Sequence, residues 1–308
     1  MSQVNRPRAG FTLVELIIVM AIVSLLAALI LGAVQVSRAS ARRLQCQNNL
    51  RQIGLAMQVH HDNLEHFPSG WSAPEGWAWG ALILPYMESA GLYENLNVRY
   101  HPVYYNMTTP PDAGEEGDVS LSFYLCPADG SIKRNPNYTS GGGVGYMKSN
   151  YVASHGDTRF ITHMVNKHTG IFGLASQVRI PQITDGTSNT FLVGERRMST
   201  KGIPSKGARF PGAIWIRCIN KGGTYMLGSS VAGLVGGTRS DHRRAVPKLN
   251  TEQANYWGFS SMHRKGANFV FADASVHFIY DQIDYQVYRN MANIDDGNDM
   301  SIYVARGF

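Results

Sequence analysis

Residues 10–35 read GFTLVELIIVMAIVSLLAALILGAVQ, and this stretch decides how the chain is organised. From Phe11 to Val34 it is an apolar run of 24 residues in which Glu15 is the only charged side chain. A straight helix of that length spans about 36 Å, which exceeds the hydrocarbon core of a bilayer at about 30 Å. The sequence therefore predicts a transmembrane helix at about residues 11–34.

Glu15 needs an explanation, because it is a carboxylate inside a membrane segment. A charge near the bilayer centre costs on the order of 2.5–3.5 kcal/mol, so such a residue is a functional candidate. A nearby cation would offset the cost, and cleavage after Gly10 would make one at the new amine of Phe11. An ordinary single-pass anchor fits the length of the run but gives no reason for Glu15.

The segment GFTLVEL, residues 10–16, resembles the cleavage and methylation site of type IV prepilins. The resemblance implies that prepilin peptidase cuts between Gly10 and Phe11 and N-methylates Phe11. It also implies that the helix packs into a filament, where Glu15 meets the N-terminal amine of a neighbouring subunit. A secretory signal peptide fits less well, because its apolar region is about 7–15 residues long and precedes the cleavage site.

The resemblance also supplies the topology, which the charges leave open. Arg6 and Arg8 precede the apolar run, but Arg38, Arg42 and Arg43 follow it closely, so the positive-inside rule does not choose an orientation. The family implies a single-pass protein of the inner (cytoplasmic) membrane with an exported C-terminal domain, which then joins a periplasmic or cell-surface filament. The implied partners are prepilin peptidase, identical or related pilin subunits and the inner-membrane assembly machinery.

The helix is predicted to continue past the membrane to about Leu64, because Pro68 and Gly70 then interrupt the pattern. Beyond the apolar run, one face of this helix carries apolar side chains at helical spacing. They are Cys46, Leu50, Ile53, Met57 and Leu64. A soluble domain can pack on this stripe, whereas the apolar run suits a bilayer or the core of a filament.

Three parts of the chain are predicted: a leader peptide over residues 1–10, a long helix over 11–65 and an exported globular domain over 66–308. Gly, Pro, Asn and Asp punctuate the third part, which favours strands and turns over long helices. We therefore expect an α+β, pilin-like fold, in which the long helix packs on an antiparallel sheet and the C-terminal domain is enlarged and β-rich. The net charge of +6 is a mild excess and does not by itself predict a nucleic-acid partner.

Five further segments occur in the order that is typical of one pilin-like family, the large prepilin-type proteins with a C-terminal domain of unknown function (DUF1559). The segments are RLQCQNNLRQIGLA (43–56), LPYME (84–88), YLCPAD (124–129), ITDGTSNT (183–190) and FSSMHRKGANFVFADASVHFI (259–279). Together with the N-terminal run they cover nearly the whole chain. The resemblance therefore extends to the globular domain as well as to the helix.

The last segment departs from the family motif H-x9-D-G at one position. His263 and Asp273 stand at the motif spacing, but Ala274 replaces the glycine. An alanine in the left-handed region is strained by about 1–2 kcal/mol, so we expect an ordinary turn at this position instead. The resemblance gives no chemical role to His263.

Three cysteines are present, Cys46, Cys126 and Cys218, and no C-x-x-C pair occurs, so the sequence does not indicate a thiolate zinc site. Export would place them in an oxidising compartment, where one disulfide and one thiol can form, but spacing alone does not give the pairing. Cys46 and Cys126 lie in segments that match the family, whereas Cys218 does not. The resemblance therefore predicts that Cys46 and Cys126 are disulfide-bonded or packed together.

Catalytic and zinc-binding patterns are weak in this chain. Ser188 has no base close to it in sequence and G-x-S-x-G is absent, so residues 185–190 are interpreted as a turn, and no enzyme is predicted. His60, His61 and His66 lie close together, but H-E-x-x-H is absent, so we interpret them as histidines on the surface of the helix.

Two charged stretches near the C-terminus have alternative interpretations. Asp295, Asp296 and Asp299 surround a glycine and offer oxygen ligands to calcium, but the spacing of an EF-hand is missing, so an acidic turn is the simpler interpretation. A basic run precedes them, at Arg239, Arg243, Arg244 and Lys248. No aromatic residues interleave it for base stacking, so no specific nucleic acid is predicted.

These observations favour a structural subunit of a type IV pilus or of a type II secretion-like filament. The alternative is a membrane-tethered, exported ligand-binding domain that does not polymerise, since the globular domain is larger than a filament needs. A third hypothesis, an exported hydrolase on a pilin-like anchor, lacks a catalytic constellation. Neither a cofactor nor a metal other than calcium is indicated.

Overall fold

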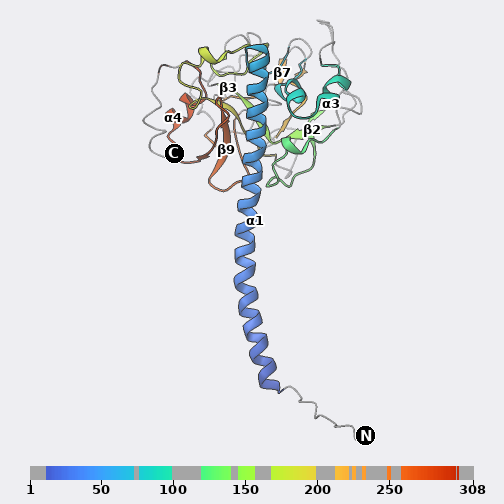
Figure 1. The fold of residues 1–308 in the computed structure, drawn as a ribbon, viewed down its shortest axis with the longest axis vertical. Helices are drawn as coiled ribbons and strands as arrows, with labels where there is room; N and C mark the ends of the chain where they lie inside the picture. The colour runs from blue at the N-terminus through green and yellow to red at the C-terminus, as the bar shows by residue number, and fades with distance from the viewer. Residues whose placement is uncertain are drawn as a thin grey trace, which may run out of the picture. The chain divides into compact units, whose positions relative to one another are not determined.

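The computed structural model describes residues 12–72, 76–98, 119–139, 145–156, 168–198, 212–221, 224–226, 231–233, 248–250, 258–295 and 297. The chain divides into two compact units, Met1–Leu44 and Gln45–Phe308. One helix, α1 (Leu13–Leu64), contributes to both units and ends at the predicted residue (Figure 1). The part of this helix from Gln45 to Leu64 therefore belongs to the second, globular unit.

The first half of α1 is apolar on every face. All described residues from Thr12 to Arg42 are exposed, and the large aliphatic side chains among them, such as Leu13 and Leu29, are 37–74 % exposed. By length and composition this helix can cross a membrane. A helix that is apolar all round needs lipid or other helices to cover it.

The globular unit is built on a five-stranded sheet. Its strands, in spatial order, are β10 (Val276–Tyr280), β9 (Gly266–Phe271), β4 (Phe191–Glu195), β3 (Tyr151–Gly156) and β8 (Val231–Gly233). Neighbouring strands are antiparallel except for β3 and β8, which run parallel. The fold is thus α+β, as predicted, with a sheet that is mainly antiparallel.

Smaller elements surround this sheet. A three-stranded sheet contains β1 (Arg134–Thr139), β2 (Gly145–Ser149) and β5 (Ala213–Ile214), and a hairpin contains β6 (Ile219–Lys221) and β7 (Thr224–Met226). The short helices are α2 (Trp79–Leu82), α3 (Ala90–Asn95) and α4 (Tyr285–Asn290), and the 3-10 helices are η1 (Leu84–Tyr86), η3 (Ser122–Tyr124) and η4 (Ile180–Gln182).

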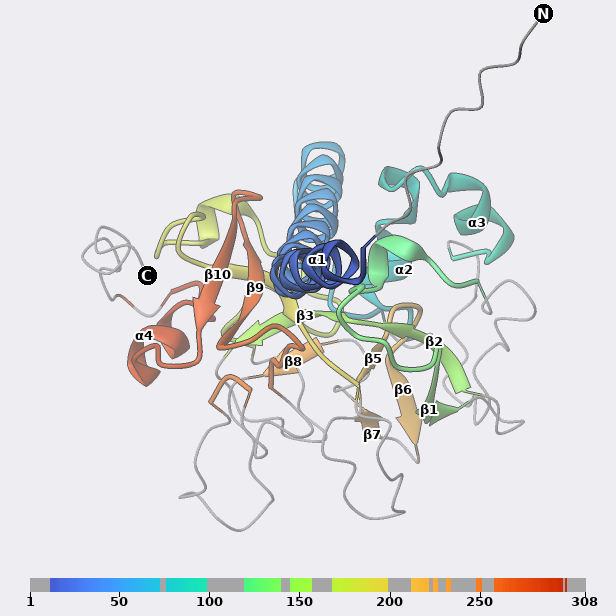
Figure 2. The ribbon, with the colours of Figure 1, turned by 90° about the horizontal axis from the view of Figure 1, so that it is seen from below.

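The second half of α1 packs against β9 and the β9–β10 turn. Of the predicted stripe, Cys46, Leu50, Ile53 and Met57 are fully buried. Leu64 is 50 % exposed, so the apolar stripe ends at Met57, about two turns earlier than predicted. Gly54 permits the close approach, because a Cβ at this position would lie 2.6 Å from Val270 Cγ2. In Figure 2 the β9–β10 hairpin lies beside α1.

Strand β9 is buried on both faces, and its side chains divide by alternation. Val270 packs in the core that includes α1, whereas Phe269 and Phe271 pack in a second core with Phe191 and with Tyr288 of α4. The rings of Phe191 and Phe269 stack with centroids 4.3 Å apart. Side chains at successive strand positions point to opposite faces, so one strand ties α1 to α4. All six residues of β9 are buried as a result.

The turn between β9 and β10 corrects one prediction. Ala274 has a φ of +64°, in the left-handed region, where we expected an ordinary turn. The turn is held by Asp273, whose Oδ1 accepts from Ser275 N at 2.8 Å, and whose N–H donates to Thr187 O at 3.1 Å. The position therefore has the geometry that favours glycine, and Ala274 adopts it at a cost of about 1–2 kcal/mol.

Candidate functional site

Glu15 closes the first turn of α1 in a reciprocal pair with Thr12. Thr12 N donates to Glu15 Oε2 at 2.9 Å, and Glu15 N donates to Thr12 Oγ1 at 3.3 Å. This is a capping box, which satisfies two backbone N–H groups that no helical carbonyl can reach. The T-x-x-E spacing of residues 12–15 is the sequence signal for this cap. Gly10 and Phe11 lie outside the described residues.

A disulfide joins α1 to the segment after η3. Cys46 and Cys126 are bonded across 80 residues of chain with their Cα atoms 5.3 Å apart, which is the pairing that the resemblance predicted. Asn49, one turn after Cys46, donates from Nδ2 to Leu125 O at 3.0 Å. The bond and this amide hold the same two segments together. Cys218 is buried elsewhere in the core and is not part of the bond.

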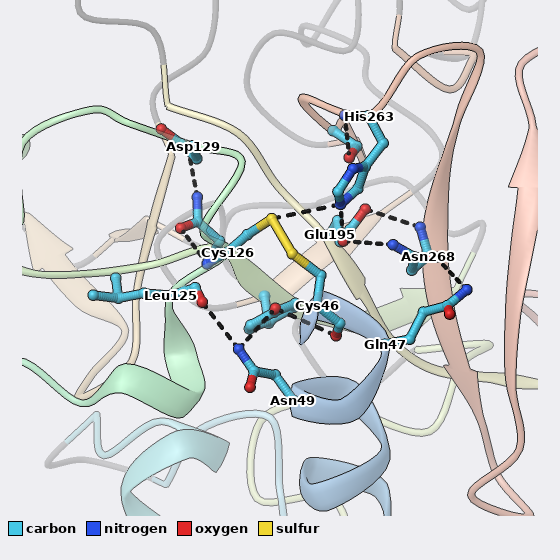
Figure 3. Close-up of a disulfide and its surroundings, with 12 residues drawn as sticks. Cys46, Gln47, Asn49, Leu125, Cys126, Asp129, Glu195, His263 and Asn268 are labelled. Atoms are coloured by element: carbon cyan, nitrogen blue, oxygen red, sulfur yellow. Dashed lines mark hydrogen bonds and ion pairs between the residues drawn. A yellow bond between two sulfur atoms is a disulfide. The ribbon is translucent and has the colours of Figure 1, made fainter. Parts of the chain in front are cut away.

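His263 and Glu195 lie directly against the disulfide (Figure 3). His263 Nε2 is 3.6 Å from Cys126 Sγ and 3.3 Å from Glu195 Oε1. Glu195 ends β4, and His263 lies in the segment that leads into β9. The Glu195 side chain is 2 % exposed and that of His263 is 7 % exposed. A histidine, a carboxylate and two sulfur atoms, which come from four segments far apart in the sequence, therefore lie together in one buried site.

Hydrogen bonds from β9 and α1 fix the Glu195 carboxylate. Asn268 donates to it twice, from its backbone N to Oε2 and from Nδ2 to Oε1, both at 2.9 Å. Gln47 Nε2 in turn donates to Asn268 Oδ1 at 3.1 Å. Such a chain of donors holds a buried carboxylate in one orientation. The residue next to Cys46 thus helps to aim the Glu195 carboxylate.

Tyr151 lies under the same site. Its hydroxyl donates to Cys46 O at 3.4 Å and accepts from Asn49 Nδ2 at 3.3 Å. Burial raises the pKa of Tyr151 well above its ordinary value, and the negative charge of Glu195 raises it further. The hydroxyl therefore keeps its proton, which it needs in order to donate to Cys46 O.

Two family models match this chain. A family model described as a protein of unknown function (DUF1559) matches residues 35–286, and a model of the prokaryotic N-terminal methylation motif matches residues 5–31. The chain belongs to the DUF1559 family. The two matches together make it a type IV prepilin-like protein, and neither family describes an enzyme. No curated protein and no solved structure matched.

The two residues of the H-x9-D motif lie at opposite ends of β9 in this DUF1559 domain. His263 precedes the strand and contacts the disulfide, whereas Asp273 follows it and holds the β9–β10 turn. The two motif residues therefore have separate structural positions, one at the disulfide and one in the β9–β10 turn, and do not form a single site. Sequence reasoning found His263 but missed Glu195, because β4 and β9 become neighbours only in the folded sheet.

The position of His60 near the end of α1 differs from the prediction. His60 is 5 % exposed, although we expected this histidine on the helix surface. Its Nδ1 is 3.0 Å from His66 O, and its ring meets the edge of Tyr86. Burial lowers the pKa of His60 to about 4. His61 accepts at Nε2 from Ile180 N at 3.2 Å, so these rings fasten the end of α1 to its surroundings.

The DGTSNT segment is a turn, as the sequence predicted. Gly186 has a φ of +95°, Asn189 Nδ2 donates to Asp185 O at 3.0 Å, and Thr190 Oγ1 donates to Gly186 O at 3.1 Å. These side chains donate hydrogen bonds to backbone carbonyl groups of their own turn. Ser188 gains no role from this geometry.

The calcium hypothesis rests on residues that are described only in part. Asp295 Oδ1 accepts from Thr184 Oγ1 at 3.0 Å, which ties this turn to the DGTSNT turn. Asp296 and Asp299 lie outside the described residues, as do Arg239, Arg243 and Arg244 of the basic run. Calcium binding there stays a prediction.

Proposed function

We propose that this chain is a structural subunit of a type IV pilus or of a type II secretion-like filament. In this proposal prepilin peptidase cuts between Gly10 and Phe11 and methylates the Phe11 amine. The helix first anchors the protein in the inner membrane and then leaves the bilayer to pack against the helices of other subunits. The match to the methylation motif over residues 5–31 supports the processing step.

The observation that carries the proposal is the uncovered first half of α1. From Leu13 to Val36 its large aliphatic side chains point outward on every face. Such a surface is stable in lipid or among similar helices, and a filament core consists of similar helices. A membrane tether that does not polymerise would need only the lipid, and it would need no charge at Glu15.

Glu15 has two roles in this proposal. The capping bonds from Thr12, through its N and its Oγ1, both end on Oε2 of Glu15. We assign Oε1 to the methylated amine of Phe11 in a neighbouring subunit, which would compensate the carboxylate in an apolar filament core. The capping box would then orient the carboxylate before the partner arrives.

The test is Glu15→Ala in the full chain, with Thr12→Ala as the matched control. Both changes remove the capping box, which costs about 0.5–2 kcal/mol of helix stability, but only Glu15→Ala removes the acceptor. We expect normal cleavage in both variants and a loss of sheared filaments in Glu15→Ala alone, measured as protein released from cells by shearing and as crosslinks between helices. Equal filament yields from Glu15→Ala and the parent would contradict the assigned role. A parent that stays in the membrane fraction without crosslinks would favour the tethered ligand-binding alternative.

A further inference from the structure

The cluster around the disulfide has a composition that the filament role does not require. Its four side chains are Cys46, Cys126, His263 and Glu195, and one ligand atom from each lies within 4.8 Å of every other. Among the described residues, these four side chains form a group of His, Cys and Glu whose ligand atoms are close enough together to hold a metal ion once the disulfide is reduced. Two sulfurs, one imidazole nitrogen and one carboxylate oxygen are a ligand set that zinc accepts.

We propose that the reduced chain binds one zinc ion through Cys46 Sγ, Cys126 Sγ, His263 Nε2 and Glu195 Oε1, and that oxidation to the disulfide releases the ion. The two states use the same residues and exclude each other. The site would hold α1 to the globular domain through the metal before the disulfide forms. Nothing in the filament proposal is needed for this inference.

The distances fit a tetrahedron. Zinc bonds of about 2.0–2.3 Å place the ligand atoms of a tetrahedral site about 3.3–3.8 Å apart. In the structure His263 Nε2 lies 3.6 Å from Cys126 Sγ and 3.3 Å from Glu195 Oε1. Two edges of the tetrahedron are therefore already set in the oxidised form. The two sulfurs must separate from their bonded distance, and the ligand atoms, which all lie within 4.8 Å of one another, must settle to the spacing of a tetrahedral site.

The surroundings of the cluster resemble the outer shell of a metal site. Asn268 donates to both oxygens of Glu195, and Gln47 orients Asn268. Hydrogen bonds of this kind fix the direction of a ligating carboxylate. Glu195 is also buried beside a histidine that balances its charge only when protonated. A divalent cation would balance the charge of Glu195 with His263 neutral, which is the form of histidine that binds metals.

The exchange between the two states balances. A dithiol reductant breaks the Sγ–Sγ bond, supplies two electrons and two protons, and itself becomes a disulfide. Zinc then binds the two sulfurs as thiolates and the two thiol protons leave. In the reverse direction a disulfide oxidant takes two electrons from the thiolates and two protons from solvent, its own S–S bond breaks and it becomes a dithiol, while the Sγ–Sγ bond forms again and zinc dissociates. His263 and Glu195 remain in place throughout.

The experiment uses the full chain in detergent with zinc as the probe. One sample is reduced with a phosphine, which is not a thiol, and another is kept oxidised. Each receives excess zinc, is freed of unbound metal by gel filtration, and is analysed for zinc per chain. We expect about one zinc per reduced chain and none in the oxidised chain, together with protection of Cys46 and Cys126 from alkylation. A reduced chain that retains no zinc would overturn the proposal, whether it is folded or unfolded.

Variants assign the ligands. Cys218→Ala removes the thiol outside the cluster and is the matched control, which should keep the full zinc content. His263→Ala and Glu195→Gln should each weaken zinc binding at least 100-fold, and Asn268→Ala should weaken it 10–100-fold as an outer-shell change. Circular dichroism of each oxidised variant checks its fold, and cobalt substitution gives a thiolate-to-cobalt absorption band that only a site with bound sulfur shows. Unchanged zinc affinity in both His263→Ala and Glu195→Gln would refute this ligand set.

Discussion

The two halves of α1 are both helical, but they differ in how much of their surface is buried. From Leu13 to Leu44 almost every side chain is exposed, whereas Cys46, Leu50, Ile53 and Met57 are sealed in the core of the globular unit. Up to Val34 the helix is apolar on every face, whereas the second half has a single apolar stripe, so the sequence pattern follows the surroundings of each part. A helix can therefore be continuous in its hydrogen bonds while its stability comes from two unrelated sources.

Removing the disulfide should have the largest effect on the globular unit. The bond closes a loop of 80 residues, so in the chain-entropy model its loss costs about 4–5 kcal/mol. We expect Cys126→Ala to lower the free energy of unfolding by about that amount, measured by denaturant titration of the full chain in detergent, with tryptophan fluorescence as the probe. All five tryptophans follow residue 44, so the signal reports on the globular unit alone. Cys218→Ala is the control, and equal losses in the two variants would show that cavity formation rather than the crosslink matters.

Acid should weaken the globular unit and spare the apolar half of α1. Burial lowers the pKa of His60 to about 4 and that of His155 to about 3, below the ordinary value of 6.5. Between about pH 6.5 and these lowered pKa values, the unfolded chain binds more protons than the folded chain. The contribution of the two histidines to the free energy of unfolding is therefore fully present above about pH 6.5, and it is lost as the pH falls toward 4 and 3. Each group contributes at most about 1.4 kcal/mol per pH unit.

The measurement is the unfolding midpoint from pH 8 to pH 4 for the parent and for His60→Gln. The variant should show a shallower slope between pH 6.5 and 4, whereas the helical signal of residues 13–44, which contain no histidine, should stay constant. Parallel curves for the parent and the variant would mean that His60 titrates normally in the folded protein.

Two glycines of α1 offer the finest comparison. A Cβ at Gly54 would lie 2.6 Å from Val270 Cγ2 and 3.3 Å from Ala274 Cα, whereas nothing lies within 4 Å of a Cβ at Gly32. We expect Gly54→Ala to destabilise the globular unit by about 1–3 kcal/mol through overpacking, and Gly32→Ala to leave it unchanged. Thermal unfolding by tryptophan fluorescence measures both. If Gly54→Ala proves neutral or stabilising, α1 and β9 are not closely packed at this position.

Much of this arrangement could be predicted from local sequence. GFTLVEL indicates the processing site, the apolar run predicts the membrane helix, and the stripe of Cys46, Leu50, Ile53 and Met57 predicts the buried face. Each of these signals depends on residues within a few turns of one helix. Periodicity is therefore sufficient to find them.

The features that were missed depend on contacts across the fold. Glu195 and Asn268 meet because β4 and β9 pair, and no spacing within one segment shows that. His60 is buried because its ring packs against Tyr86, on a separate segment. Ala274 takes a positive φ because the hairpin requires it, against its own preference. In each case tertiary structure overrides the local tendency of a residue.

The mass of the mature N-terminus tests the central claim most directly. If the chain is a processed filament subunit, mass spectrometry of protein purified from cells will find a first residue Phe11 that carries an N-methyl group. The basic leader will be gone, and Glu15 will stand four residues from the new amine. A chain that retains Met1, or one cut after residue 30, would contradict the account.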